Sequence, residues 1–247
     1  GRLTTAANAN STQKFYYNGS GVATRKDVTD SSGTHTVIDG LHVGRTPIYK
    51  SYSPGAVTVG TTVAPWTYDG AGRLKSIPGQ ITDQTYEPDG QTKTITYANG
   101  VSTTFSYSPT RRWLTRIVTR VANGVPILDS AYTRDNAGRI LAINGFNARD
   151  DWTYAYDDLD RLVSATNLGD PALSETFTYA VSDNMLSRSR NPGGAFASGG
   201  TAPFAYTYPA GTAARPHAPV SVAGRSFTYD ANGNTLNDGI RTYTWAN

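Results

Sequence analysis

The sequence contains no cysteine, a single methionine and three histidines among its 247 residues. The absence of cysteine excludes disulfide bridges, thiol catalysis and every metal site built on sulfur. No stretch approaches the roughly 18 apolar residues that a membrane-spanning helix needs. The hydrophobic content is only 38% and the formal net charge is +3. This composition suits thin sheets with many turns better than a thick helical core.

Residue patterns that carry catalysis are equally scarce. His35, His42 and His217 form no pair with the spacing of zinc ligands. The acidic pairs Asp150-Asp151 and Asp157-Asp158 lack the spaced oxygen ligands of a calcium loop. Neither a dinucleotide-binding nor a phosphate-binding glycine loop is present. We therefore predict no enzymatic activity, no metal site and no cofactor within these residues.

Aromatic residues placed two positions apart recur along the whole chain. Because side chains alternate across a β-strand, both rings of such a pair lie on one face. The pairs and triplets are Trp66-x-Tyr68, Phe105-x-Tyr107, Trp152-x-Tyr154-x-Tyr156, Phe177-x-Tyr179, Phe204-x-Tyr206-x-Tyr208, Phe227-x-Tyr229 and Tyr243-x-Trp245.

Most of these aromatic pairs run into a turn of one kind. An aspartate after the tyrosine can accept hydrogen bonds from backbone N–H groups, and a glycine three residues later allows a positive φ. An Arg-Leu pair then starts the next strand, so one unit is strand, turn, strand. The turn residues of the best copies are Tyr68, Asp69, Gly72 and Arg73; Asp135, Gly138 and Arg139; Tyr156, Asp157 and Arg161; and Tyr229, Asp230 and Gly233.

Degenerate copies fill the intervals, so that units recur about every 20 to 30 residues, which is typical of a repeat architecture. Arg134 takes the tyrosine place in one unit, and Gly44-Arg45 follows another after a delay. The segments 91–97 and 101–107 alternate as strands, and Asn99-Gly100 between them predicts a two-residue hairpin. Residues 191–200 and 210–219 read as loops. A lone hairpin is marginal in water, so the units must lie side by side to bury their aromatic face.

These residues resemble the YD-repeat, or Rhs, family over essentially the whole chain. The marks are the Tyr-Asp-x-x-Gly-Arg-Leu units, as in 68–74, and the segment Tyr229-Asp230-Ala231-Asn232-Gly233-Asn234. The family includes bacterial Rhs toxins, the C component of insecticidal toxin complexes, wall-associated bacterial proteins and animal teneurins. The resemblance implies an all-β fold in which stacked antiparallel hairpins form a curved, spiralling sheet, part of a hollow shell. In toxin members that shell encloses a carboxy-terminal effector.

The resemblance also sets the expected domain organisation. Residues 1–247 are predicted to be one continuous segment of about ten degenerate units. The sequence opens on Gly1-Arg2-Leu3, which looks like the tail of a repeat, and stops in mid-motif at Asn247. We therefore expect a fragment of a longer chain. Nothing matches the family's self-cleavage segment or an effector, and Asp170-Pro171 reads as part of a loop.

Arginines and aromatic residues interleave, as they do in many nucleic-acid-binding proteins. Here the net charge is small, and Arg73, Arg139 and Arg161 recur at turn exits. We expect such an arginine to pair with the aspartate of a neighbouring repeat or to lie over a ring, and we predict no nucleic-acid partner. The regular spacing of the aromatic residues likewise favours packing over a carbohydrate-binding surface.

Two classes of function remain open. The first is a structural scaffold that encapsulates or displays a toxin or effector polypeptide in a secreted bacterial protein, with the rest of the shell and the effector as partners. The second is an extracellular adhesion module that binds a glycan or a protein, with a self-associating cell-surface fibre as a variant. Both place the chain outside the cell or at its surface. The reading frame after Asn247 would discriminate between them.

Overall fold

The computed structural model describes residues 1–42, 46–189 and 204–245. About half of these residues lie in β-strands, and their paired strands are antiparallel. The helical elements among them are two short 3-10 helices, η1 (Ala148–Asp150) and η2 (Pro171–Leu173). The predicted all-β antiparallel fold is confirmed. The expected loop at 191–200 and Gly44-Arg45 lie outside the described residues.

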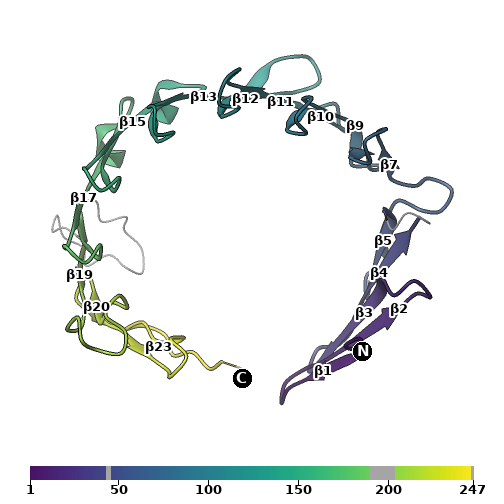
Figure 1. Cartoon of the computed structure of the whole chain (residues 1–247), viewed down its shortest axis with the longest axis horizontal. Coiled ribbons are helices and arrows are strands. Elements are labelled where there is room, and N and C mark those ends of the chain that lie inside the picture. The colour runs from purple at the N-terminus through teal and green to yellow at the C-terminus, as the bar shows by residue number, and fades with distance from the viewer. Residues whose placement is uncertain (43–45, 190–203, 246–247) are drawn as a thin grey trace. The chain divides into compact units, whose positions relative to one another are not determined.

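The chain divides into two compact units. The first comprises residues 1–107 and 117–128, with 246–247 outside the description. Its first six strands form one sheet in chain order, as Figure 1 shows for the strands coloured purple to blue. These strands are β1 (Thr5–Ala7), β2 (Thr12–Tyr17), β3 (Ala23–Asp30), β4 (Gly33–Leu41), β5 (Pro47–Ser53) and β6 (Val57–Val59). The strands that follow in this unit are β7 (Thr67–Tyr68), β8 (Leu74–Ser76), β9 (Ile81–Tyr86), β10 (Thr92–Tyr97) and β11 (Ser102–Tyr107).

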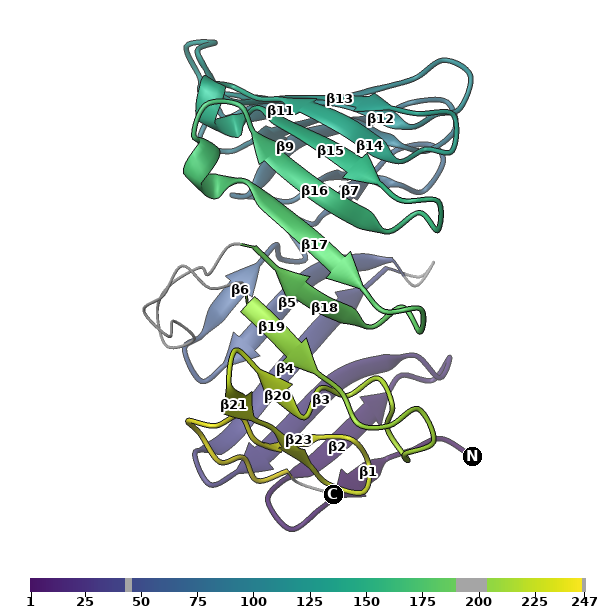
Figure 2. The same cartoon turned by 90° about the vertical axis from the view of Figure 1, so that its left-hand side faces the viewer.

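The second unit comprises residues 108–116 and 129–245, so that β12 (Leu114–Arg120) and β13 (Pro126–Arg134) each contribute to both units. Figure 2 shows its strands β14 to β19 succeeding one another along the sheet. The remaining strands are β14 (Ile140–Asn144), β15 (Trp152–Tyr156), β16 (Leu162–Asn167), β17 (Glu175–Tyr179), β18 (Met185–Arg188), β19 (Phe204–Thr207), β20 (Ser221–Val222), β21 (Arg225–Ser226), β22 (Thr228–Tyr229) and β23 (Thr235–Asn237). No strand occupies 210–219, as the sequence predicted.

The strands do not form the one sheet that we expected from the repeats. β9 to β21 are hydrogen-bonded in chain order, whereas β1 to β6 form their own sheet and β7–β8 and β22–β23 are separate hairpins. The β7–β8 hairpin, which separates the two large sheets, is flanked by Pro65 before β7 and Pro78 after β8. Proline has no N–H to give to a ladder, so sheets tend to end where it occurs.

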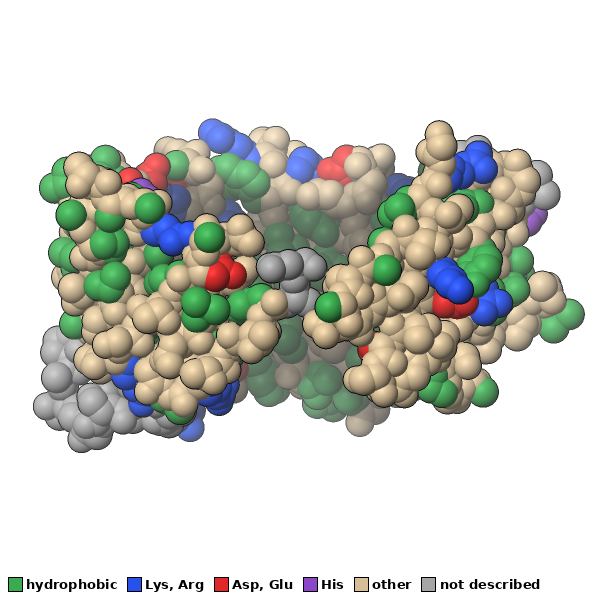
Figure 3. Space-filling model, turned by 90° about the horizontal axis from the view of Figure 1, so that it is seen from below, with side chains coloured by type: hydrophobic (Ala, Val, Ile, Leu, Met, Phe, Trp, Pro, Cys, Tyr) green, Lys and Arg blue, Asp and Glu red, His purple; other side chains and the backbone are tan. Residues whose placement is uncertain are grey.

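The aromatic face is covered less completely than the sequence suggested. Only four hydrophobic side chains among the described residues are buried, namely those of Val118, Ala165, Phe204 and Val222. Most rings are half-buried, and they pack on neighbours in the same sheet; Trp152 and Tyr154 stack with ring centroids 6.4 Å apart. In Figure 3 apolar side chains, drawn green, lie interspersed with polar ones on the visible surface. The contacts between successive repeats must therefore supply much of the stability.

Within the described ranges, no helix has the length and apolar character needed to cross a bilayer.

Candidate functional site

The feature repeated most regularly along the chain is the turn that closes successive hairpins. In each such turn the first residue donates its backbone N–H to the carbonyl four residues on, and its own carbonyl accepts the N–H three residues on. Asp69 does this with Arg73 and Gly72, at 2.8 and 2.9 Å. The fourth residue has a positive φ, which is 77° at Gly72. The same pair of bonds recurs in turns that begin at Asn18, Asp69, Glu87, Tyr97, Val121, Asp135, Asp157, Ala180 and Asp230.

This geometry corrects the prediction of a two-residue hairpin at Asn99-Gly100. The turn has three residues, because Tyr97 donates its N–H to the carbonyl of Val101 and accepts from Gly100. Gly100 has a φ of 81°, but Asn99 is not among the residues of positive φ. A two-residue type I′ turn needs positive φ at both central residues. The register shift beside the Tyr68–Leu74 pair marks the same arrangement at Asp69.

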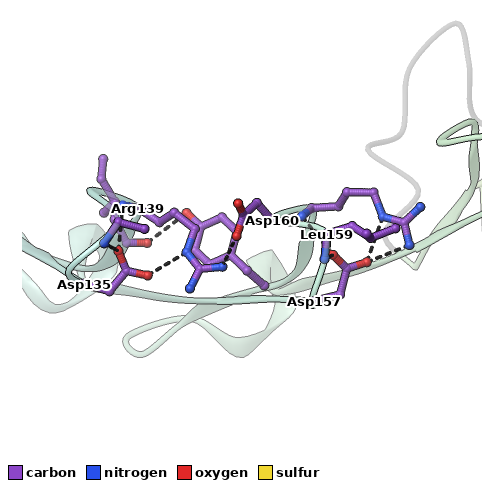
Figure 4. Close-up of polar contacts among 9 residues, drawn as sticks. Asp135, Arg139, Asp157, Leu159 and Asp160 are labelled. Atoms are coloured by element: carbon purple, nitrogen blue, oxygen red, sulfur yellow. Dashed lines mark hydrogen bonds and ion pairs between the residues drawn. The ribbon is translucent and has the colours of Figure 1, made fainter.

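Where the first residue of the turn is an aspartate, both oxygens of its carboxylate accept hydrogen bonds. Asp157 Oδ1 accepts the N–H groups of Leu159 and Arg161, at 3.0 and 2.9 Å, and its Oδ2 accepts from Nε of Arg161 at 2.8 Å. Figure 4 shows this cluster beside the one at Asp135, where Arg139 has the same role. Asp69 and Arg73 repeat it, and Asp230 does so with Asn234 in place of arginine.

These hydrogen bonds stabilise the charged form of each aspartate. At Asp135 the side chain of Arg139 is the main reason for a lowered pKa, and at Asp230 it is the side chain of Asn234. Burial alone would raise the pKa of Asp157, but the backbone and side chain of Arg161 together lower it. A carboxylate held in this way is a poor general acid or base at neutral pH.

The arginine at the last position of the turn contacts the next repeat. The guanidinium of Arg73 lies 4.4 Å from the ring centroid of Tyr86, and those of Arg139 and Arg161 lie 5.1 and 4.9 Å from Tyr156 and Tyr179. Arg139 and Arg161 also form ion pairs with a second aspartate, Asp160 and Asp183, at 2.5 and 2.8 Å. The sequence led us to expect such an arginine to pair with the aspartate of a neighbouring repeat or to lie over a ring. Arg139 and Arg161 do both, and Arg73 lies over a ring.

The tyrosine of each unit completes the connection by donating its hydroxyl to the preceding repeat. The acceptor is the carbonyl of the residue that follows the preceding arginine, as for Tyr156 with Ile140 at 2.9 Å and Tyr179 with Leu162 at 2.8 Å. We call the set of turn aspartate, arginine, next tyrosine and accepting carbonyl the inter-repeat latch. The hydroxyls of Tyr17, Tyr68, Tyr86, Tyr107 and Tyr229 make the same kind of bond, to the carbonyls of Leu3, Pro47, Leu74, Thr92 and Pro219.

Two further acceptors of the latch arginines were not predicted from the sequence. Asp160 and Asp183 stand at the fourth place of their turns, where the other turns have glycine, and their φ values are 63° and 65°. Short polar residues tolerate this left-handed conformation better than others do. Each accepts the arginine of the preceding turn, as Figure 4 shows for Arg139 and Asp160. The sequence feature that could have indicated these contacts is an acidic residue at the glycine position of the motif.

At one junction the latch is rearranged. The residue directly before β12 is Trp113, whereas an arginine stands directly before β14 and β16. The last residue of β13 is Arg134, whereas a tyrosine ends β15 and β17. Aromatic ring and cation have thus exchanged places. Arg134 Nη1 donates to the carbonyl of Gly138 at 2.9 Å, and Trp113 lies against that glycine.

The histidines make isolated polar contacts. His35 contacts the hydroxyl of Ser32 at 2.9 Å, and Nδ1 of His217 lies 2.7 Å from Oδ1 of Asn184. Across 1–42, 46–189 and 204–245 no three acidic or histidine side chains come together as metal ligands would. Asp170 caps η2 through its bond from the N–H of Ala172, so the Asp170-Pro171 segment is a turn.

Comparisons with known proteins connect this chain to solved structures only. No protein-family model matches it, and no curated protein matches it. The crystal structure of TcdB2-TccC3-Cdc42 contains a chain that is 15% identical, and the match covers 96% of this chain with a TM-score of 0.73. The structure of the Photorhabdus luminescens Tc holotoxin pore with a TccC3 mutation gives 16% identity, 96% coverage and a TM-score of 0.70.

The crystal structure of TcdB2-TccC3 without its hypervariable C-terminal region agrees, at 16% identity, 96% coverage of this chain and a TM-score of 0.73. The matches span only about 15% of the length of those chains. Identity at this level establishes the fold alone. The chain therefore shares the β-fold of a stretch of these toxin-complex proteins.

Proposed function

We propose that this chain is a non-catalytic structural segment of a YD-repeat, Rhs-type β-shell, in a longer secreted bacterial protein that encloses or displays a toxin or effector polypeptide. The observation that carries the proposal is the inter-repeat latch. Its polar side chains join each repeat to the next. Arg161, which is bonded to Asp157 in its own turn, also donates to Asp183 and to the carbonyl of Ala180 in the next repeat. A sheet assembled by such contacts is what a wall built from repeats requires.

The chemistry of the turn aspartates supports the same conclusion. Catalytic carboxylates keep an oxygen free for substrate and have a pKa tuned toward the working pH. Asp69, Asp135 and Asp157 instead accept several hydrogen bonds each, and their pKa values are lowered. Side chains in this state stabilise turns and have no proton to exchange at neutral pH.

The structural neighbours give the proposal its biological setting. They are parts of toxin complexes, and one of them is described as TcdB2-TccC3 without its hypervariable C-terminal region. If this chain serves a comparable protein, a variable effector follows it in the reading frame and the rest of the shell surrounds that effector. Secretion of the whole protein is part of the same proposal.

The direct test is protease protection in the full reading frame that contains this segment. We expect a downstream effector segment to resist a broad-specificity protease while the protein is native and to be cleaved once urea unfolds the repeats. The same effector segment expressed alone is the control and should be cleaved at once. Equal cleavage rates for the enclosed and the isolated segment would contradict the proposal. A reading frame with a membrane or wall anchor in place of an effector would favour the adhesion module.

A further inference from the structure

The rearranged junction at Trp113 and Arg134 borders a pocket of about 320 Å³. The residues that line it include Arg111, Trp113, Tyr132, Arg134 and Asn136. The volume is at the lower end of the range for small-molecule sites, about 300–1,000 Å³. A departure from the repeat thus coincides with a cavity of the size that would hold one sugar ring.

The charge of this pocket is not balanced by the protein. Arg73, Arg139 and Arg161 each pair with a carboxylate. In the part of the chain that the structure describes, neither Arg111 nor Arg134 has such an ion pair: Arg111 lies over the Trp113 ring at 5.0 Å, and Arg134 lies 5.9 Å from that of Tyr132.

The acidic residue in the wall, Asp135, leaves this imbalance in place. Both of its oxygens already accept hydrogen bonds, and its ion pair is with Arg139 and not with Arg111 or Arg134. Arg111 and Arg134 therefore both line one small pocket, and neither forms an ion pair with a carboxylate in the described part of the chain. Arginine is well suited to bind a carboxylate through paired hydrogen bonds.

The arrangement has a cost that the regular latch avoids. Nε of Arg134 is buried and has no hydrogen-bond partner. An unpaired buried donor costs free energy, and such a group in a native structure calls for an explanation. A tyrosine in this place, as at Tyr156 and Tyr179, would donate its hydroxyl to a carbonyl and leave no unpaired N–H. The arginine at this place is therefore not explained by the stability of the repeat.

The remaining wall has the amphipathic character that suits a sugar. Trp113 and Tyr132 provide apolar ring surface. Gly138 leaves room for the indole, because a Cβ there would lie 3.0 Å from its Cζ2 atom. The exposed hydroxyl of Thr110 and the amide of Asn136 add polar groups beside the rings. β13 is hydrogen-bonded to β12 and β14, so no free strand edge is available there for an extended peptide.

From these observations we infer that the pocket binds an acidic sugar residue, with Arg111 and Arg134 holding its carboxylate and the rings of Trp113 and Tyr132 packing on its body. This inference is independent of the shell function, since a wall segment and an adhesion module could each display such a site. It concerns a place where the repeat pattern is broken, whereas the proposed scaffold depends on where it is kept.

The test is a ligand-observed NMR titration of the 247-residue chain with glucuronate, glucose and acetate. We expect glucuronate to bind at least about tenfold more tightly than either glucose or acetate, because it alone offers a carboxylate and a ring. Raising the salt concentration should weaken glucuronate binding. Equal binding of glucose would show that charge has no part in recognition, and equal binding of acetate would show a simple anion site. Either result, or no binding of glucuronate, overturns the inference.

Arg134→Tyr is the decisive variant, because it restores the residue that the regular repeats carry and should therefore fold. We expect it to weaken glucuronate binding about tenfold or more while its urea midpoint stays equal or rises. Arg120→Gln is the matched control, since Arg120 also donates to the carbonyl of a glycine four residues on, Gly124, but does not border the pocket. Full binding by Arg134→Tyr, or an equal loss in Arg120→Gln, would contradict the assignment.

Discussion

Tyr154 and Tyr156 stand two residues apart on β15 and share a half-buried aromatic face, yet only one of them belongs to the latch. The hydroxyl of Tyr156 donates to the carbonyl of Ile140, while that of Tyr154 has no hydrogen bond within the described residues. Substitutions at these two tyrosines therefore distinguish the contribution of the hydroxyl to the free energy of unfolding from that of the ring.

We expect Tyr156→Phe to lower the free energy of unfolding by about 1 kcal/mol, the typical net value of one hydrogen bond, and Tyr154→Phe to leave it nearly unchanged. Urea unfolding of both variants, followed by circular dichroism, measures the difference. Equal midpoints for the two variants would show that the hydroxyl bond between repeats adds nothing to stability.

A second prediction at this scale concerns Asp27 on β3. Its carboxylate accepts two bonds from Arg25 and one from Thr36, each at 2.8 Å, and its exposure is 7%. The side-chain bonds from Arg25 are the main reason that its pKa falls from 3.8 to about 2. Because the folded chain favours the charged form, this stabilisation is complete above the unfolded pKa and is lost as the pH falls from about 4 toward 2.

The wild-type chain should therefore lose stability over that acidic window more steeply than Asp27→Asn, which has no proton to bind there. The measurement is the urea midpoint at several pH values. Asp158→Asn serves as the control, because Asp158 is exposed and its side chain makes no hydrogen bond in the described part of the chain. A parallel pH dependence in wild type and Asp27→Asn would contradict the assignment.

Much of the residue-level chemistry could be predicted from the sequence, and the reason is local. The bonds of Asp157 to Leu159 and Arg161 lie within five residues, so the motif alone defines them. The acceptor of the Tyr156 hydroxyl could not be predicted, because it depends on the register between repeats. Asp160 was missed because the motif led us to expect glycine there, although aspartate also tolerates a positive φ.

At the scale of one element, the turn at Asp69 shows what the glycine place requires. Gly72 has a φ of 77°, and a Cβ added there would meet no atom within 4 Å. A substitution at this place therefore acts through backbone conformation and not through a clash. The aspartates at the corresponding places, with φ of 63° and 65°, show that a short polar residue is accepted.

We expect Gly72→Val to cost about 1–3 kcal/mol of stability, the usual range for a strained backbone residue, and Gly72→Asn to cost less. Adding Asp69→Ala to Gly72→Val should lower the urea midpoint further, because it removes the acceptor of three hydrogen bonds. Ala71→Ser, at the exposed tip of the same turn, should have little effect. Equal midpoints for Gly72→Val and Gly72→Asn would mean that the turn does not hold this conformation.

Strand positions followed from the sequence better than turn types and sheet boundaries did. Alternation at 101–107 predicted β11 almost to the residue, because period-two patterning is a property of the strand itself. The prediction of a two-residue turn at Asn99-Gly100 was wrong. The dipeptide is compatible with more than one hairpin loop, and a β-bulge at the end of the turn decides between them. The sheet breaks near Pro65 and Pro78 depend on which strand edges meet, and that is not encoded in either hairpin alone.

Over the whole chain, the repeats define a ladder of nearest-neighbour contacts more than a central core. Stability in such a protein approximates a sum of units and of the interfaces between them. Trp152 and Tyr154, which stack at an interplanar angle of 10°, contribute to the interface between β15 and its neighbours β14 and β16. The burial of aromatic rings was overestimated from the sequence, because the pattern shows that rings share a face but not how fully that face is covered.

The last prediction follows from this ladder. Replacing Trp152 and Tyr154 by alanine should cost less per ring than the about 3–5 kcal/mol of a fully buried aromatic truncation, because both rings are half-buried. Amide hydrogen exchange should lose protection first in β14, β15 and β16, while β2 to β5 keep theirs. Replacing His35, His42 and His217 together by glutamine is the control and should leave the exchange pattern unchanged. A uniform loss of protection that includes β2 to β5 would show that the chain unfolds as a single cooperative body, and a loss caused by the histidine changes would point to a site that the latch does not explain.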